Sequence, residues 1–170
     1  MFERFLLAID DTSAGEVGIS FATALARKHG ASVHVFHANE FIFGGRGVTA
    51  ETHADATRLV QNAVDQLRAD GVEATGECVL ANVFTLAPRI TEAASRSGAN
   101  AILFGSHRHH WLTRFLGKGV RDRVTRMTAL PVLTAPSPLK ISGRRHGPDA
   151  EVRRLALADK ASADSQTVNG

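Results

Sequence analysis

Ala101-Ile102-Leu103-Phe104-Gly105-Ser106 is the stretch that decides the fold of this chain. Four apolar residues in a row are typical of a buried strand, and a glycine directly after them lets the backbone turn tightly. The chain continues through His107-Arg108-His109-His110-Trp111 to Leu116-Gly117-Lys118-Gly119-Val120, where a helical pattern begins. Because free amides at a helix start can hold an anion, we predict a phosphate-binding loop at this place in an α/β sheet.

Outward from this stretch, short apolar runs alternate with helical periods. The runs predict five strands, at Phe5–Ile9, Ser32–His37, Val72–Leu80, Ala101–Phe104 and Val132–Thr134. Between them, apolar residues recur at helical spacing in four segments, around 17–25, 60–67, 86–94 and 120–127. This alternation predicts an α/β fold in which one mainly parallel sheet is covered by helices on both faces.

Length and composition fit one domain with a tail. The chain has 170 residues, and its 44% hydrophobic content is enough for a sizeable core. From Ser137 on, the sequence is polar and rich in small residues, so we expect one domain over residues 1–136 and a disordered tail over residues 137–170. No secretion signal and no apolar run of about 20 residues is present, so we expect a cytoplasmic location without membrane insertion. The single cysteine, Cys78, lies in a strand pattern that favours a buried or half-buried thiol.

Basic residues gather between His107 and Arg126, although the net charge of the chain is only +3. In this segment Asp122 is the single acidic residue, against Arg108, Arg114, Lys118, Arg121, Arg123 and Arg126. Such clustering favours a polyanionic partner. The alternative is an ordinary solvated helix face, which is what most charge runs are.

A second candidate site is Asp10 with Asp11, where the first predicted strand gives way to the first helix. Two adjacent carboxylates at the carboxyl edge of a parallel sheet can accept hydrogen bonds from ribose hydroxyls or an exocyclic amine. Helix capping is the other interpretation, because Ser13 and Glu16 have the spacing of a capping box. We expect Asp10 to contact a ligand and Asp11 to serve as the cap.

Four segments carry a recognisable pattern when they are taken together. They are Phe5-Leu-Leu-Ala-Ile-Asp-Asp-Thr-Ser13, Val33-His-Val-Phe-His37, Ser97-Gly-Ala-Asn-Ala-Ile-Leu-Phe-Gly-Ser106, and Val120-Arg-Asp-Arg-Val124 with Leu130-Pro-Val-Leu133. Over residues 2–136 the chain thereby resembles the universal stress protein family. The resemblance implies a single doubly wound open sheet of five parallel strands in the order 3-2-1-4-5 with four helices, a Rossmann-like fold similar to the adenine nucleotide alpha hydrolases. Asp10 and the Gly105 loop then meet at the switch point of the sheet, where ligands bind.

The loop departs from the pattern of the ATP-binding members that the chain resembles. In those members a glycine is followed by two residues, a second glycine, nine residues, and then glycine with serine or threonine. This chain keeps Gly105 but has Arg108 and Lys118 at the next two glycine positions and Gly119 at the hydroxyl position. A side chain at position 108 costs about 1 kcal/mol if a positive φ is required there, while Arg108 offers a guanidinium fork to a phosphate. The backbone cradle is weakened and the local positive charge is strengthened, and Gly117 leaves open an alignment shifted by one residue.

The resemblance implies binding of ATP or a related adenine nucleotide, with Mg²⁺ only as part of the bound nucleotide. The implied binding residues are Asp10, Ala38, Gly105, Ser106, Arg108, Lys118, Gly119 and Val120. The altered loop leaves two other outcomes open, a different anion or no small ligand. We assign no catalytic residue and no metal site, because the sequence shows neither a nucleophile with an aligned base nor a convincing set of three metal ligands.

We expect a stress-response regulatory protein that senses adenine nucleotide through a degenerate phosphate loop. One alternative is a nucleotide-free dimeric adaptor whose basic loop and helix bind a protein or polyanion, and another is a slow ATPase. In the resembled family the last strand pairs two copies of the chain, so a homodimer through Val132, Leu133 and Thr134 is implied. A further protein partner is expected without being identified, and nucleic acid is not an expected partner.

Overall fold

The computed structural model describes residues 2–42, 48–49, 51–106 and 119–136. The chain divides into two units, Met1–Pro138 and Leu139–Gly170, and all the elements below belong to the first. Residues 137–170 lie outside the described residues, so the disorder of the tail stays a prediction.

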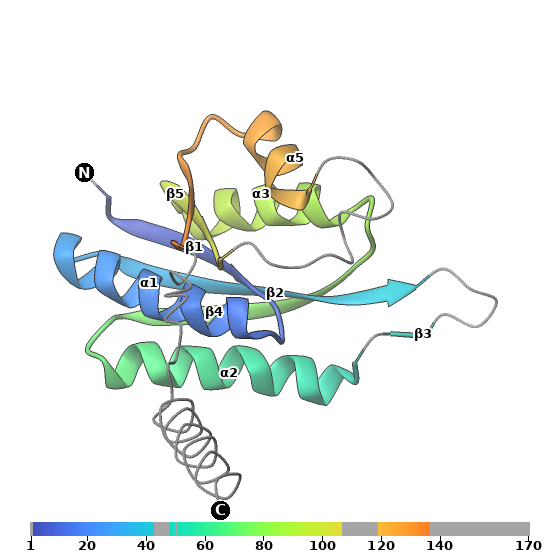
Figure 1. Cartoon of the computed structure of the whole chain (residues 1–170), viewed down its shortest axis with the longest axis horizontal. Coiled ribbons are helices and arrows are strands. Elements are labelled where there is room, and N and C mark those ends of the chain that lie inside the picture. The colour runs from blue at the N-terminus through green and yellow to red at the C-terminus, as the bar shows by residue number, and fades with distance from the viewer. Residues whose placement is uncertain (1, 43–47, 50, 107–118, 137–170) are drawn as a thin grey trace, which may run out of the picture. The chain divides into compact units, whose positions relative to one another are not determined.

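Five parallel strands form the sheet, in the order β4-β2-β1-β5-β6 (Figure 1). Their bounds are β1 Arg4–Ile9, β2 Ser32–Ile42, β4 Ala74–Ala81, β5 Ala101–Phe104 and β6 Val132–Thr134. Numbered by their succession among the parallel strands, they have the order 3-2-1-4-5, so the predicted topology is confirmed. The central strand β1 lies between β2 and β5, where its apolar residues are shielded on both faces.

A short additional strand, β3 (Val48–Thr49), was not predicted. It pairs antiparallel with the end of β2, where Phe41 lies opposite Thr49. In the structure β2 runs on to Ile42, well past the predicted end at His37. Asn39 and Glu40 have the character of turn residues in the sequence. They nevertheless stay in the strand because β4 pairs with β2 as far as Glu40 opposite Ala81.

Helices cover both faces of the sheet, as predicted. On one face lie α1 (Ser13–His29) and α2 (His53–Ala69), and on the other lie α3 (Leu86–Ser97) and α5 (Val120–Met127) (Figure 1). The structure places Pro88 third in α3, in the first turn, where its missing N–H removes no helical hydrogen bond. Before this turn the Asn82 side chain accepts hydrogen bonds from Phe84 N at 2.9 Å and Thr85 N at 3.0 Å.

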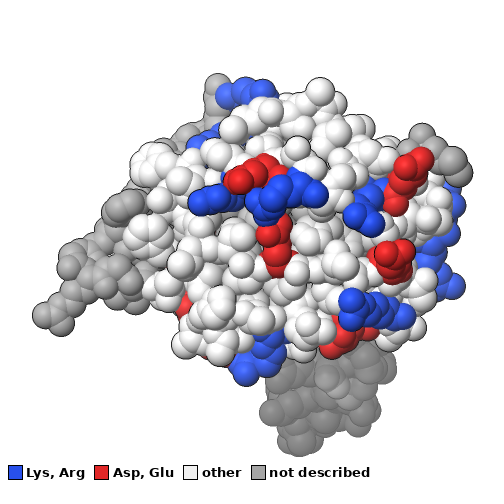
Figure 2. All heavy atoms as spheres, turned by 180° about the vertical axis from the view of Figure 1, so that it is seen from behind, with Lys and Arg blue, Asp and Glu red and all other residues white. Residues whose placement is uncertain are grey.

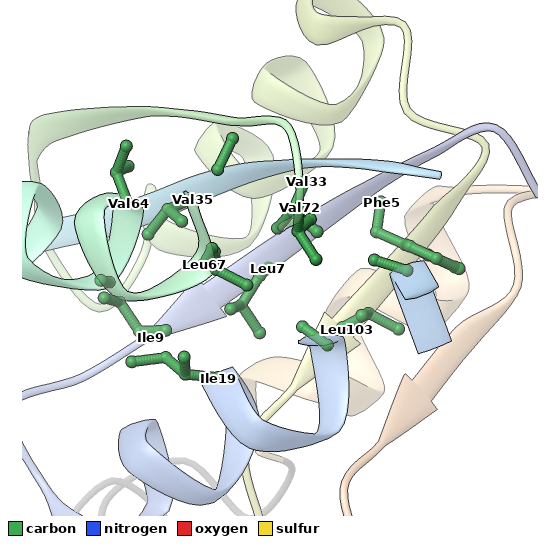
Figure 3. Close-up of a cluster of buried hydrophobic side chains, with 14 of the residues drawn as sticks. Phe5, Leu7, Ile9, Ile19, Val33, Val35, Val64, Leu67, Val72 and Leu103 are labelled. Atoms are coloured by element: carbon green, nitrogen blue, oxygen red, sulfur yellow. The ribbon is translucent and has the colours of Figure 1, made fainter. Parts of the chain in front are cut away.

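The alternation of side chains along the strands creates two hydrophobic cores. Leu7 and Val35 belong to the core beneath α1 and α2, while their neighbours Leu6 and Phe36 belong to the core beneath α3 and α5. Figure 3 shows the first core, in which Leu7 and Val35 lie beside Leu67 of α2. Buried strands of this kind hold the carboxyl ends of β1 and β5 side by side, and β2 continues past the end of β1.

Gly76 on β4 provides a test of the packing between the sheet and α2. A Cβ at this position would lie 2.5 Å from Val60 Cγ1 and 3.0 Å from Val64 Cγ2, and both valines are buried and stiff. We expect Gly76→Ala to lower the free energy of unfolding by about 1–3 kcal/mol in urea denaturation. Gly119→Ser is the control, because a Cβ there meets nothing within 4 Å and serine is a good N-cap. A similar loss in both variants would contradict this packing.

Candidate functional site

The candidate site lies at the carboxyl edge of the sheet, between β1 and its two neighbours. β1 pairs with β5 as far as Ala8 opposite Phe104, so Asp10 and Gly105 follow the ends of adjacent strands. It pairs with β2 as far as Ile9 opposite His37, so Ala38 comes next on that side. Three predicted site residues, far apart in the sequence, therefore come together at the point where the chain order in the sheet reverses.

The Asp10 side chain is exposed, and its orientation is set by hydrogen bonds within its own turn. Its Oδ1 accepts a hydrogen bond from Thr12 N at 3.2 Å and another from the Thr12 hydroxyl. This local bonding fixes the side chain at the start of α1. Both bonds use Oδ1, so Oδ2 remains an acceptor toward the solvent side as far as the described residues show. The side chain of Ser13 lies outside the described part, so the predicted capping box stays a prediction.

Two glycines of α1 bring this helix against the edge. A Cβ on Gly15 would lie 2.4 Å from the Asp10 carbonyl oxygen, and a Cβ on Gly18 would lie 3.1 Å from Gly105 Cα. The helix backbone therefore approaches both arms of the candidate site more closely than any side chain would allow. Neither glycine was recognised as part of the site. Their spacing, continued by the buried Ala22, was the available signal, because it places small residues on one helix face.

The Gly105 loop is described only at its two ends. Ser106 is buried, and Gly105 is half-buried beside α1. Arg108 and Lys118 lie outside the described residues, as do His107, His109, His110 and Trp111. At the far end Gly119 is the N-cap of α5 in an extended conformation, with φ −61°, and no side chain caps the helix. Val120 is half-buried and packs against the second core.

A buried polar cluster lies next to Asp10, and the sequence analysis did not find it. The His37 side chain is 6% exposed, and its Nδ1 lies 3.0 Å from the Ile9 carbonyl oxygen. Its Nε2 lies 2.5 Å from Glu51 Oε1. Asn39 donates from Nδ2 to the main-chain oxygen of Glu51 at 3.2 Å. These contacts join the ends of β1 and β2 to the residue just before the N-cap of α2.

Burial also affects two neighbouring titratable groups. Desolvation raises the pKa of Glu40, and the charge of His37 partly offsets this effect. Desolvation likewise raises the pKa of the Cys78 thiol, an effect opposed by a backbone hydrogen bond from Asn39 and reinforced by the Glu51 charge. Cys78 is half-buried, as predicted, and its raised pKa keeps the thiol protonated and unreactive at neutral pH.

The arginines of α5 are largely used within the protein. Arg123 donates from Nη1 to the Val83 carbonyl at 2.6 Å and from Nη2 to the Phe84 carbonyl at 2.8 Å. Arg121 bonds Thr134 Oγ1 at 3.4 Å and pairs with Asp122 at 3.4 Å. Arg126 is exposed and has no such bond among the described residues. The described part of the basic segment is therefore less available to a partner than its sequence indicates.

Other charged side chains are paired in a similar way. Arg96 of α3 contacts Glu77 of β4 at 2.6 Å and Glu92 at 3.3 Å, and Arg89 contacts Glu92 at 3.1 Å. Figure 2 shows basic and acidic atoms side by side on the face behind Figure 1, separated by uncharged surface. This visible face carries no continuous basic patch among its described residues.

The helices that the structure describes include none with the length and apolar character needed to cross a membrane. No three metal-ligating side chains converge within residues 2–42, 48–49, 51–106 and 119–136. In the same ranges β6 pairs only with β5, and its residues Val132, Leu133 and Thr134 are half-buried.

Fold and site together define a doubly wound α/β protein whose candidate ligand site lies at the switch point of the sheet. Residues 1–136 match the model of the universal stress protein family, so the chain belongs to this family. The resemblance found in the sequence is thereby confirmed. No curated protein sequence matches the chain significantly.

Solved structures of universal stress proteins are similar to the chain over nearly their whole length. One from Burkholderia pseudomallei has 21% identity and a TM-score of 0.60, covering 80% of this chain and 97% of that one. One solved in complex with cAMP has 17% identity and a TM-score of 0.60, covering 78% and 95%. One from Archaeoglobus fulgidus in complex with dAMP has 25% identity and a TM-score of 0.58, covering 79% and 98%.

The clasp between α5 and the turn before α3 can be tested through Arg123. Its removal leaves the Val83 and Phe84 carbonyls without their donors, so we expect Arg123→Gln to lower the free energy of unfolding by about 1–3 kcal/mol in urea denaturation. Arg126→Gln removes the same charge from the same helix and should stay within about 0.5 kcal/mol of the parent. Equal effects of the two substitutions would show that the clasp contributes nothing specific.

Proposed function

We propose that this protein is a stress-response regulatory protein that binds ATP or a related adenine nucleotide at the edge formed by Asp10, Ala38 and Gly105. The convergence of these three residues at the switch point is the observation that carries the proposal. Two similar universal stress proteins, solved in complex with cAMP and with dAMP, support an adenine nucleotide as the ligand class. We further propose that it acts in the cytoplasm.

Each predicted residue has a role that suits its chemistry. The exposed Asp10 carboxylate would accept hydrogen bonds from ribose hydroxyls, and the backbone of Ala38 would contact the base. Gly105, Ser106, Gly119 and Val120 would present amide or hydroxyl donors to the phosphates, because they lie at a strand end and a helix start. Arg108 and Lys118 would add positive charge to this set. Mg²⁺ would arrive with the nucleotide, coordinated by its phosphates.

The described residues at the two ends of the Gly105 loop can still offer backbone amides to a phosphate. A Cβ on Gly18 would lie 3.1 Å from Gly105 Cα, so α1 packs directly against the backbone at the end of β5. Gly119 has a negative φ and open space around it, so what it offers a phosphate is its amide rather than an unusual conformation. The chain therefore combines a partial backbone cradle with side-chain charge.

An adaptor function through the basic helix has less support. Arg121 and Arg123 are engaged by Thr134, Asp122 and the carbonyls before α3. Reversing their charges would disturb the fold before it tested a partner. Slow ATP hydrolysis needs only a bound nucleotide and a positioned water, and it is subordinate to binding.

Binding of Mg-ATP can be measured by isothermal titration calorimetry together with mass spectrometry of ligand carried through purification. We expect binding to the parent protein and about tenfold weaker binding to Asp10→Ala, because one ribose acceptor is lost. Asp65→Ala is the matched control, since this carboxylate is exposed on α2 and bonds only Gln61 among the described residues. Absence of both heat and thermal stabilisation with millimolar Mg-ATP would overturn the proposed function.

A homodimer through β6 is proposed with it. Ala135 N donates to the Phe104 carbonyl of β5 at 2.9 Å, so the preceding amide of Thr134 points away from β5 toward the open edge. We expect Thr134→Pro to remove that donor and shift the protein from dimer to monomer in light scattering after size exclusion. Thr134→Val keeps the amide and should remain dimeric. A dimer that survives Thr134→Pro would place the interface elsewhere.

A further inference from the structure

The His37 ring lies between two groups that act as hydrogen-bond acceptors. On one side Nδ1 lies 3.0 Å from the main-chain oxygen of Ile9, and on the other Nε2 lies 2.5 Å from Glu51 Oε1. The His37 side chain is 6% exposed, so water has little access to it. Both ring nitrogens are therefore committed to protein partners.

This arrangement requires one proton more than a neutral imidazole and a carboxylate possess. A carbonyl oxygen only accepts, so Nδ1 must carry a hydrogen and donate it to Ile9. In a neutral ring Nε2 would then present a lone pair to the Glu51 carboxylate, and two acceptors would face each other. A hydrogen lies between Nε2 and the Glu51 carboxylate only if the ring is an imidazolium or if Glu51 is protonated. In either case the pair binds one additional proton.

The position of Glu51 is fixed by more than this contact. Asn39 donates to its main-chain oxygen at 3.2 Å, and the next residue, Thr52, caps α2 by accepting from Asp55 N at 3.1 Å. Glu51 is thus tied to β2 through its backbone and to β1 through His37. The Asn39 Oδ1 is buried and has no hydrogen-bond partner among the described residues, and as an amide oxygen it can only accept, so it is not a donor to the pair.

We propose that His37 and Glu51 bind one proton between them at neutral pH, and that this proton holds the Asp10 end of β1 to the start of α2. Raising the pH removes the proton, and the resulting repulsion between Nε2 and the carboxylate loosens this edge of the sheet. The stabilisation is thus present at low and neutral pH and lost on the alkaline side. At acidic pH a protonated Glu51 still offers an oxygen to the imidazolium, so no comparable repulsion arises. The coupling of this proton to ligand affinity rests on the proposed function, whereas its effect on stability does not.

Other titratable groups on the elements around His37 set the background for this titration. They are Asp10 after β1, Glu40 on β2, Cys78 on β4, Glu16 on α1, and His53 and Asp55 in the first turn of α2. Asp55 already accepts from Thr52 and Arg58. Burial raises the pKa of Glu40, which lies three positions further along β2. All of these groups are present in both the parent protein and Glu51→Gln, and the Cys78 thiol is the one whose pKa the Glu51 charge also raises.

The opposite face of the sheet provides a matched pair without this requirement. His34 also contacts a carboxylate, with its Nε2 3.3 Å from Glu77 Oε1. Its Nδ1, however, lies 2.8 Å from the Thr75 hydroxyl, which can donate as well as accept. A neutral His34 is therefore satisfied by donating from Nε2 to Glu77 and accepting from Thr75. Arg96 additionally neutralises Glu77 at 2.6 Å.

The closing experiment compares the parent with Glu51→Gln and the control Glu77→Gln in thermal unfolding from about pH 6 to about pH 9. Glutamine at 51 can donate its amide hydrogen to Nε2, so it keeps the contact without the extra proton. We expect the melting temperature of the parent to fall on the alkaline side by about 5 °C more than that of Glu51→Gln. Glu77→Gln should keep the slope of the parent. Equal alkaline slopes in the parent and Glu51→Gln would overturn the proposal.

Nuclear magnetic resonance of the parent protein decides the question even if Glu51→Gln does not fold. The ¹⁵N shifts of the His37 ring and the ¹³C shift of the Glu51 carboxyl report where the proton lies. An imidazolium, or a protonated Glu51, at about pH 7 is the expected result. A neutral ring with a bare Nε2 facing an ionised Glu51 would overturn the proposal.

A calorimetric arm separates this inference from the proposed function. Mg-ATP affinity is measured at about pH 7.5 and about pH 9, where the terminal phosphate is ionised throughout. We expect affinity to fall about fivefold in the parent and to stay level in Glu51→Gln. Parallel falls in both proteins would overturn the coupling. Absence of ATP binding at both pH values would overturn the proposed function alone. The shared proton is tested separately, by thermal unfolding and by the resonance shifts.

Discussion

The parallel pairing of β1 with β5 is the constraint on which the candidate site depends. It aligns Ala8 with Phe104, so the residues after each strand emerge side by side although almost a hundred positions separate them. Residues with a Cβ at positions 15 and 18 of α1 would collide with the backbone of Asp10 and Gly105. Both glycines let the helix lie directly against the strand ends, where Asp10 is exposed and Gly105 is half-buried. Strand order and helix packing therefore produce the site together.

The parts of this architecture that are local in sequence were predictable. Unbroken apolar runs identify the strands at Phe5–Ile9 and Ala101–Phe104, because burial on both faces removes polar alternation. Asp10 and Gly105 were predictable for the same reason, since each follows directly after such a run. Family membership follows from several of these local patterns in combination. The order of the strands came from the resemblance and is confirmed by the pairing of β2 with both β1 and β4.

The parts that depend on contacts between distant residues could not be predicted. His37 and Asn39 read as polar residues at the end of a strand, and only the placement of Glu51 above them shows that they are buried and bonded. Arg123 reads as one of several basic helix residues, and only its two carbonyl partners distinguish it from exposed Arg126. A single sequence cannot assign these pairs, because each partner is drawn from another element at a separation set by the whole fold.

On both flanks of the candidate site, side-chain nitrogens form hydrogen bonds with main-chain carbonyl oxygens. On one flank His37 holds the Ile9 carbonyl just before Asp10, and on the other Arg123 holds the turn that precedes α3 against α5. Hydrogen bonds from a charged guanidinium are stronger than those from a neutral donor. Apolar packing has no comparable dependence on protonation or on a nearby anion. This edge of the sheet is therefore held by polar contacts to main-chain oxygens, whereas the centre of the sheet is held by apolar packing.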